Sequence, residues 1–171
     1  MIKSERITSA SPTIKQLTLI GVGLIGGSFA LDLKRQNRVD RVVGIDTDAN
    51  NLARALERKV IDEAFSEINS TSVGQSELIV IATPVATLPE ICRTLAPLVD
   101  KNTVITDVGS TKQSTVDAFY RYLPKQLRYC VAAHPIAGSD RNGALAAQFG
   151  LYQDKKLMIC PHELQDETSI E

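Results

Sequence analysis

A glycine-rich run near the start of the chain has the spacing of a loop that holds a dinucleotide. Gly21, Gly23 and Gly26 follow the pattern GxGxxG, directly after an apolar stretch and directly before a helical pattern. That context matters, because a lone GxGxxG occurs by chance in many turns. Gly21 permits a tight turn, Gly23 lets the backbone approach a pyrophosphate, and Gly26 lets the helix pack on the strand. The free N–H groups that open this helix, around Leu24 and Ile25, would then face the phosphates.

An acidic residue follows at the distance that such a loop requires. Asp46 comes about 20 residues after Gly26, where the second strand of a dinucleotide-binding unit ends. A carboxylate there can accept hydrogen bonds from both hydroxyls of the adenosine ribose and would repel a 2′-phosphate. Thr47 and Asp48 come next, where an arginine typically accompanies NADP. The sequence therefore predicts NAD as the cofactor; the alternative is a plain βαβ turn in which Asp46 caps a helix.

His134 and Ser110 are the candidates for catalytic residues. A histidine titrates near neutral pH, as a general base for a hydroxyl must, and Pro135 fixes the backbone directly after His134. The other histidine, His162, lies in a charged segment beyond the last apolar run. Taken alone, His134 could be an ordinary loop histidine, and Ser110 could be the N-cap of the next helix. Their expected position at the same sheet edge as the glycine loop favours a functional role.

Other residues with distinctive chemistry occupy the same set of loops. Thr83 could bond the ribose or the pyrophosphate, and Pro84 would shape a turn that lacks a backbone donor. Gly138 is expected to let its loop approach the cofactor or substrate closely. We interpret Asp107 and Lys112 as structural, with the carboxylate capping a turn and the lysine neutralising it.

The elements that must position these residues alternate between short β-rich runs and amphipathic stretches, as in parallel α/β sheets. Strands are expected at residues 17–20, 41–45, 78–82, 103–106, 129–133 and 156–160. Apolar side chains at helical spacing predict helices around residues 25–33, 49–58, 88–95 and 116–123, the second with Asp48 as its N-cap. Right-handed crossovers would place helices on both faces of the sheet. The predicted fold is α/β, a doubly wound, mostly parallel Rossmann sheet whose ligand lies beyond the carboxyl ends of the strands.

Composition adds limits on the class of protein. The 171 residues suffice for one domain, predicted at 16–161, with a flexible tail at 1–15 and a linker or truncated helix at 162–171. A net charge of -1 gives no basis for binding nucleic acid or an anionic membrane. The three cysteines show no CxxC pairing, so we expect buried, reduced thiols, no metal site and a cytoplasmic location. Asp140 and Arg141 are expected to be solvated surface charges.

Several motifs resemble the prephenate dehydrogenase family, which includes arogenate and cyclohexadienyl dehydrogenases. They are GVGLIGGSFA at the glycine loop, VIDEA from residue 60, ATPV from residue 82, DVGSTK from residue 107 and HPIAGS from residue 134. Their order and spacing match that family over residues 16–161. DVGSTK and HPIAGS are the most specific, because Rossmann proteins in general lack them.

The resemblance implies an NAD-dependent oxidative decarboxylation of prephenate to 4-hydroxyphenylpyruvate, or of arogenate to tyrosine, in tyrosine biosynthesis. In that family the histidine of the HPxAG motif, here His134, hydrogen-bonds the ring hydroxyl and assists removal of its proton. The serine of the DxGSxK motif, here Ser110, orients that histidine near the nicotinamide. Hydride passes to the nicotinamide, and CO2 leaves as the ring becomes aromatic.

The resemblance also implies a part that this chain does not contain. Family members continue into a helical C-terminal domain that forms a homodimer interface and supplies an arginine for the substrate. We therefore expect the chain alone to bind NAD but to turn over the small-molecule substrate poorly. Two alternatives are a β-hydroxyacid dehydrogenase-like reductase, which leaves HPIAGS unexplained, and a non-catalytic NAD-binding module.

Overall fold

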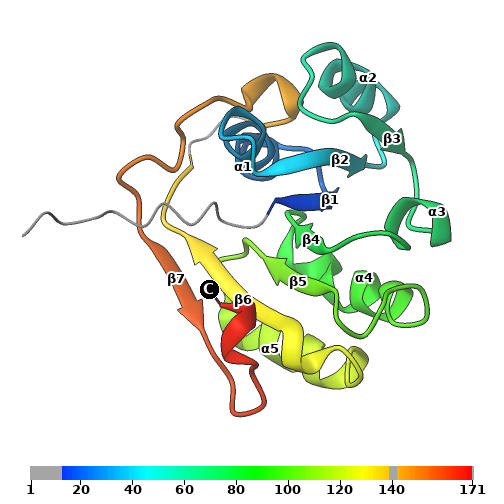
Figure 1. Ribbon diagram of the computed structural model, residues 1–171, viewed down its shortest axis with the longest axis vertical. Coiled ribbons are helices and arrows are strands. Elements are labelled where there is room, and N and C mark those ends of the chain that lie inside the picture. The colour runs from blue at the N-terminus through cyan, green and yellow to red at the C-terminus, as the bar shows by residue number, and fades with distance from the viewer. Residues whose placement is uncertain (1–12, 139–141, 171) are drawn as a thin grey trace, which may run out of the picture.

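A seven-stranded sheet runs through the middle of the protein in the computed structural model, which describes residues 13–138 and 142–170. The strands lie in the order β3, β2, β1, β4, β5, β6, β7 (Figure 1). Their bounds are β1 (Ile14–Ile20), β2 (Val39–Ile45), β3 (Glu63–Phe65), β4 (Leu78–Ile81), β5 (Val104–Asp107), β6 (Cys130–Pro135) and β7 (Leu157–Cys160). Every neighbouring pair is parallel except β6 with β7, which is antiparallel.

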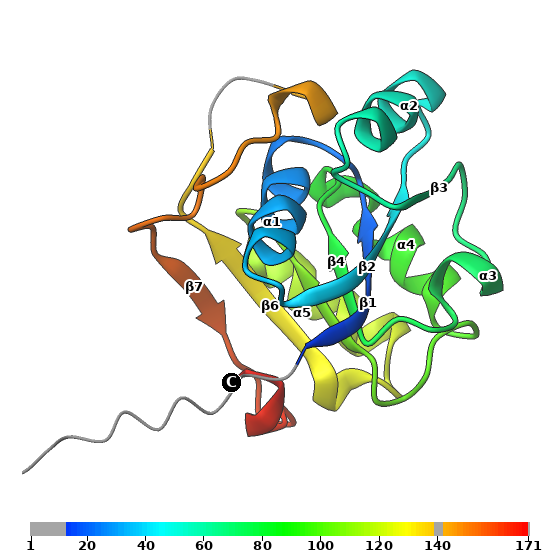
Figure 2. The same ribbon diagram turned by 45° about the horizontal axis from the view of Figure 1, so that its top comes forward.

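Helices cover both faces of this sheet, as Figures 1 and 2 show. One face carries α1 (Leu24–Arg35) and α2 (Ala49–Glu57), and the other carries α3 (Ser70–Val73), α4 (Leu88–Leu95) and α5 (Lys112–Tyr122). In the described residues, short 3-10 turns lie in three connections, at η1 (Val85–Thr87), η2 (Leu127–Tyr129) and η3 (Ala144–Ala146), and one follows β7, at η4 (Glu167–Ser169). The prediction of a doubly wound, mostly parallel Rossmann sheet is confirmed.

Side chains that point alternately to the two faces of each strand divide the hydrophobic core into two layers. In β1, Leu17 and Leu19 are fully buried against α1 and α2, whereas Ile20 packs on the opposite side with the residues of α4 and α5. Successive side chains of a strand point to opposite faces, so a strand covered on both sides must be apolar throughout. This packing fixes the carboxyl ends of β1, β2, β4 and β5 along one edge, where the loops with chemical residues emerge.

Several predicted boundaries are wrong. The first strand begins at Ile14, inside the predicted tail, because the Ile14 N–H donates to the Arg38 carbonyl and Ile14 pairs with Val39. The sixth strand runs from Cys130 to Pro135, so His134 lies within the strand instead of after it. Strand β3 was not predicted at all. Asp140 and Arg141, predicted as surface charges, lie outside the described residues.

In the segment predicted as a linker or a truncated helix, residues 162–170 form no α-helix in this structure. Residues 162–170 contain only the turn η4, because the Asp166 side chain accepts a hydrogen bond from Thr168 N–H and caps it. The Asp166 N–H donates to the Arg128 carbonyl, and an imidazole nitrogen of His162 lies 3.2 Å from the Cys130 carbonyl oxygen. These contacts fold the segment back against the start of β6.

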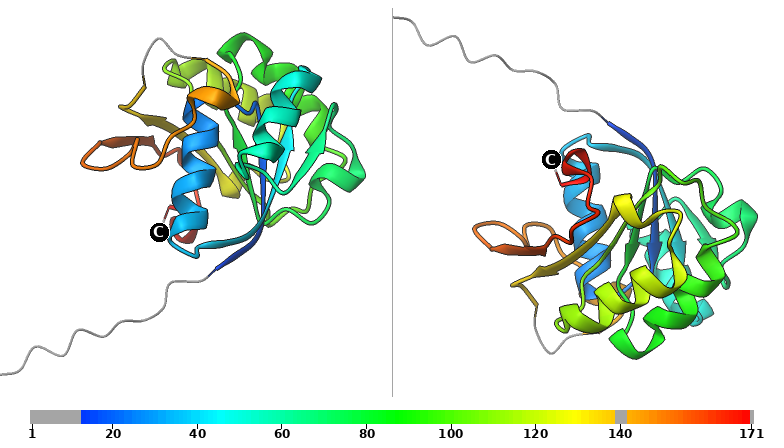
Figure 3. Two further views of the ribbon diagram at one scale, coloured as in Figure 1. Left: turned by 90° about the horizontal axis from the view of Figure 1, so that it is seen from above. Right: turned by 90° about the horizontal axis from the view of Figure 1, so that it is seen from below.

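Residues 142–156 return across the outside of α1, and β7 with the loop before it stands at one side of the molecule (Figure 3). Three hydrogen bonds tie this return segment to α1. The Gln148 N–H donates to Ser28 Oγ at 3.0 Å, the Gly150 N–H to Asp32 at 2.7 Å, and the Tyr152 hydroxyl to the Ile25 carbonyl at 2.6 Å. Among the residues that the structure describes, no helix is both long and apolar enough to cross a membrane.

Candidate cofactor and active site

Each glycine of the GxGxxG loop has a distinct physical reason to be glycine. Gly21 has a φ of +89°, and a Cβ there would lie 2.7 Å from the Ala82 carbonyl oxygen. A Cβ on Gly26 would lie 2.5 Å from Leu19 Cδ1, so this glycine lets α1 pack closely on β1. A Cβ on Gly23 would meet nothing within 4 Å. The space above Gly23, at the start of α1, is therefore the part of the loop that is free to receive a ligand.

Asp46 stands directly beside this loop, at the end of β2. Its Oδ2 accepts from the Val22 N–H and from the Asn51 side-chain amide, both at 3.0 Å, and its Oδ1 accepts from the Asp48 N–H at 3.0 Å. The carboxylate is half-buried, and no lysine or arginine of the described residues forms an ion pair with it. The alternative that Asp46 caps a helix is wrong, because Asp48 caps α2 by accepting from the N–H groups of Asn50 and Asn51, as predicted.

A cleft of about 680 Å³ opens beside the glycine loop. Its lining includes Gly21, Gly23, Asp46, Thr83 and Pro84, five of the predicted cofactor residues. The volume falls within the range of small-molecule sites in proteins. Among the described residues, the ionisable side chains that line it are carboxylates, from Asp46, Glu67 and Glu90. Such a lining favours hydroxyl donors over a further phosphate group.

The other predicted cofactor residues lie behind or beside this cleft. Leu24 is buried and Ile25 half-buried in the first turn of α1, next to Gly26, where backbone N–H groups rather than side chains would contact a ligand. Gly138 has a φ of +142°, and a Cβ there would lie 3.3 Å from Ile25 Cδ1. The loop that follows His134 therefore passes directly over the start of α1.

The end of β5 forms a buried polar corner around Asp107, which is 1% exposed. Lys112 Nζ donates to both carboxylate oxygens of Asp107, at 2.6 and 2.5 Å, and to the Ala133 carbonyl at 2.6 Å. The same carboxylate accepts from the N–H groups of Gly109 and Ala133 and from the Thr115 hydroxyl. The predicted structural roles of Asp107 and Lys112 agree with this geometry. The corner joins β5, α5 and β6 immediately before His134.

The buried thiol of Cys92 lies close enough to Asp107 for the negative charge of that carboxylate to affect its pKa. Burial, and to a smaller extent the negative charge of Asp107, raises the pKa of Cys92 to about 12. Burial likewise raises the pKa of Cys130. These two cysteines are buried free thiols, as expected, whereas Cys160 is only partly buried.

Ser110 belongs to the loop that follows β5, and His134, near the end of β6, lies beside that loop. The imidazole Nδ1 of His134 lies 3.4 Å from the Val108 carbonyl oxygen, and the ring is half-buried. Ser110 is exposed, and no hydrogen bond joins it to His134 within the described part of the chain. The N-cap of α5 is Thr111, so the alternative that Ser110 caps this helix is wrong.

Sequence reasoning missed one residue of the cleft wall, Asn51. Its side chain contacts both Asp46 and the segment after the His134 loop, through Ala144. The sequence offers only a weak signal, an amide at the third position of a helix that starts just after Asp46. Two of its hydrogen-bond partners, Val22 and Ala144, lie 29 and 93 residues away in the sequence. The order of residues along the chain alone does not reveal these contacts.

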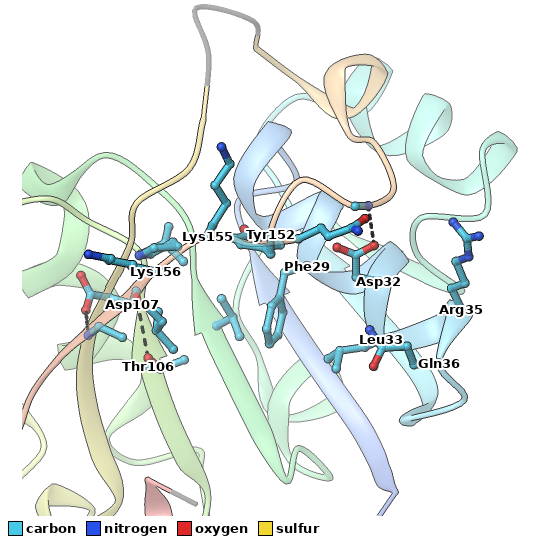
Figure 4. A pocket seen from close by; sticks show the side chains of 17 residues that line it. Phe29, Asp32, Leu33, Arg35, Gln36, Thr106, Asp107, Tyr152, Lys155 and Lys156 are labelled. Atoms are coloured by element: carbon cyan, nitrogen blue, oxygen red, sulfur yellow. Dashed lines mark hydrogen bonds between the residues drawn. The ribbon is translucent and has the colours of Figure 1, made fainter.

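A second hollow of about 740 Å³ lies on the α1 face of β4, β5 and β6 (Figure 4). Phe29 and Leu33 of α1 and Tyr152 line it, and Lys155 and Lys156 also contribute. Phe29 and Tyr152 meet edge to face, with ring centroids 6.1 Å apart, and burial raises the pKa of Tyr152. None of the predicted cofactor or catalytic residues lines this hollow, so it is distinct from the glycine-loop cleft.

Fold and cleft together define a nucleotide-binding Rossmann domain, with its ligand site at the carboxyl edge of the sheet. The family model for the prephenate dehydrogenase nucleotide-binding domain matches residues 29–171, and the chain belongs to this family. A prephenate dehydrogenase of Bacillus subtilis is 35% identical over 156 residues, which are 91% of this chain and 42% of that protein. The chain thus spans less than half the length of this relative. The match favours the family resemblance over a β-hydroxyacid dehydrogenase-like reductase.

Solved structures agree with the sequence match. The crystal structure of prephenate dehydrogenase from A. aeolicus, in complex with hydroxyphenyl propionate and NAD+, superposes with a TM-score of 0.84 at 26% identity, covering 94% of this chain and 55% of that one. Synechocystis arogenate dehydrogenase has the same fold, with a TM-score of 0.80 at 24% identity, covering 91% and 53% of the two chains.

Proposed function

We propose that this chain is the NAD-binding and part-catalytic domain of a dehydrogenase that oxidatively decarboxylates prephenate or arogenate in tyrosine biosynthesis. The proposal includes a small-molecule substrate, a cytoplasmic location and a homodimer for the complete enzyme. Family membership supports the reaction class, and the cleft beside the glycine loop supports the cofactor. The A. aeolicus prephenate dehydrogenase was crystallised with NAD+.

One observation carries the choice of cofactor. The half-buried Asp46 carboxylate faces a cleft in which the charged side chains of the described residues are all acidic, next to a glycine loop with open space above Gly23. A ribose with two free hydroxyls can donate hydrogen bonds to that carboxylate. A 2′-phosphate would meet the like charge of Asp46, with the Glu67 carboxylate also in the lining, whereas Glu90 is paired with Arg93. The residues present thus fit NAD and disfavour NADP.

The catalytic half of the proposal assigns roles to two residues. NAD, when bound, accepts the hydride that leaves the substrate ring. His134 would accept the proton of the ring hydroxyl, because a neutral imidazole is a suitable base near neutral pH. With Nδ1 directed toward the Val108 carbonyl, Nε2 is the nitrogen available for that proton. Ser110, on the loop after β5, would orient the imidazole once the site is occupied.

The cofactor assignment is tested by titrating the chain with NAD and NADP. We expect NAD to bind much more tightly than NADP, and Asp46→Ala to weaken NAD binding by a factor of about 10 to 100, since charge-assisted hydrogen bonds contribute about 1.5–3 kcal/mol. A thermal melt checks that the variant remains folded. Equal NAD affinity in the wild type and Asp46→Ala would refute the assignment.

The catalytic assignment needs an assay of turnover beside one of binding. In the form of the enzyme that oxidises prephenate or arogenate, His134→Asn should keep the NAD affinity and lower kcat by about 10²–10⁴, the usual contribution of a general base. A His134→Asn variant with normal kcat would show that this histidine is not the base.

A further inference from the structure

Asn51 lies where three separate parts of the cleft meet. Its amide nitrogen donates to the Val22 carbonyl at 2.8 Å and to Asp46 Oδ2 at 3.0 Å, and its carbonyl oxygen accepts from the Ala144 N–H at 2.7 Å. Val22 belongs to the glycine loop, Asp46 ends β2, and Ala144 follows the His134 loop. The side chain is 8% exposed, so these bonds are shielded from water.

The partners of Asn51 leave only one orientation for its amide. A backbone N–H can only donate and a backbone C=O can only accept, so the oxygen must face Ala144 and the nitrogen must face Val22. In that orientation the nitrogen also meets the Asp46 carboxylate. An aspartate at this position could keep the bond to Ala144 but would bring a second negative charge against Asp46.

The rest of α2 reinforces this arrangement. The Asn51 N–H donates to Asp48 Oδ1 at the helix cap, which holds the start of the helix. At the far end of the helix, the Arg58 guanidinium donates to the carbonyl oxygens of Ala144 and Ala147. Both ends of α2 therefore contact the segment after the His134 loop. Of the two contacting residues, Asn51 also bonds to Asp46.

We propose that Asn51 is a positioning residue for NAD, which orients the Asp46 carboxylate toward the adenosine ribose and couples that carboxylate to the segment after the His134 loop. This inference rests on the proposed NAD binding. A neutral amide fixes Oδ2 of Asp46 and leaves the negative charge of the carboxylate in place. A lysine at this position would cancel that charge. Oδ1 accepts only from the Asp48 N–H among the described residues, so it keeps room for a ribose hydroxyl.

The decisive variant is Asn51→Asp, with Asn50→Asp as its matched control. Asn50 is the preceding residue on α2, is exposed, and makes no side-chain hydrogen bond to the described residues. Both substitutions add one negative charge, but only the first places it against Asp46. Two adjacent carboxylates raise the pKa of one of them, so a proton can be shared at low pH and is lost as the pH rises.

NAD titrations at pH 5.5 and pH 8 separate the outcomes. For Asn51→Asp we expect affinity near that of the wild type at pH 5.5 and a loss of about tenfold at pH 8, equivalent to one lost charge-assisted hydrogen bond. Wild type and Asn50→Asp should change little over this range. If Asn51→Asp follows Asn50→Asp at both pH values, the positioning role is wrong. If the wild type does not bind NAD, the proposed function fails, and this inference fails with it.

A second variant tests the coupling and does not depend on tolerance of the added charge. Asn51→Ala removes all three side-chain bonds, and Asn50→Ala is its control. In the wild type, saturating NAD should slow amide hydrogen exchange at Ala144, and Asn51→Ala should abolish that effect while weakening NAD binding about tenfold. Slowing that persists in Asn51→Ala, with unchanged NAD affinity, would overturn the inference.

Discussion

Two aspartates at equivalent places in the sheet, Asp46 and Asp107, have opposite surroundings. Each stands at the carboxyl end of a parallel strand, and each accepts hydrogen bonds from loop N–H groups. Asp107 is 1% exposed and paired with Lys112, whereas Asp46 is half-buried and its side-chain partner is the neutral amide of Asn51. The first carboxylate has its charge balanced within the protein. The second keeps a charge that a ligand can use.

The comparison shows that position along the sheet edge does not by itself identify a ligand-binding residue. What separates the two aspartates is the balance of charge and the exposure of the remaining oxygen lone pairs. A carboxylate that is buried must be paired or fully hydrogen-bonded, because desolvation of an isolated charge is costly. Asp107 therefore organises the protein, whereas no lysine or arginine of the described residues balances the charge of Asp46.

The largest expected effect comes from breaking the Asp107 corner. Lys112→Met should lower the free energy of unfolding by about 3–5 kcal/mol, because it leaves a buried carboxylate without its counter-charge. Denaturant unfolding followed by circular dichroism measures this. Arg93→Met is the control: it breaks the exposed pair with Glu90 and should cost less than about 1 kcal/mol. Equal costs for the two variants would show that Lys112 does not stabilise a buried charge.

Substitutions in the glycine loop should have intermediate effects. We expect one glycine there to be needed for stability and another for NAD binding. Gly26→Ala places a methyl group against Leu19, Ala82 and the Gly21 carbonyl, so it should lower the free energy of unfolding by about 1–3 kcal/mol. Gly23→Ala meets no atom within 4 Å and should cost under about 1 kcal/mol, in keeping with an exchange at a helix N-cap.

NAD titration completes the contrast between the two glycines. Gly23→Ala should weaken NAD binding by at least about tenfold, since its methyl group fills the space through which the pyrophosphate approaches the backbone. A stable Gly23→Ala variant with full NAD affinity would mean that the cofactor does not cross this loop.

How far the sequence predicts this site depends on the range of the interactions. Gly21, Gly23 and Gly26 could be interpreted from their spacing, because the turn and the helix start are local. Asp46 could be predicted because the order of elements brings the end of β2 beside that loop. The cap at Asp48 was equally local and is confirmed.

The parts that were missed depend on distant contacts. Asn51 bonds to Ala144, 93 residues further along, and no local pattern signals that pairing. Strand β3 contains only Glu63–Phe65, too short for a period to be visible, and it exists because it pairs with β2. Ile14 likewise belongs to a strand only because Val39 lies opposite. Tertiary pairing, not local propensity, decides these elements.

The smallest expected effect distinguishes Asp46 from its acidic neighbour. Asp48→Ala removes the side-chain cap of α2 and should lower the free energy of unfolding by about 1 kcal/mol. The Asp48 N–H that donates to Asp46 Oδ1 belongs to the backbone and survives the substitution, so NAD affinity should change little. Thermal melts and NAD titrations of Asp48→Ala and Asp46→Ala, made side by side, measure both quantities. If the two variants lost NAD affinity equally, NAD binding would depend on the total negative charge at this edge of the sheet or on a well-formed start of α2. A loss confined to Asp46→Ala would instead support a role for the carboxylate itself in NAD binding, the property in which Asp46 differs from Asp107, through a bond to the ribose or through its hold on the Val22 N–H of the glycine loop.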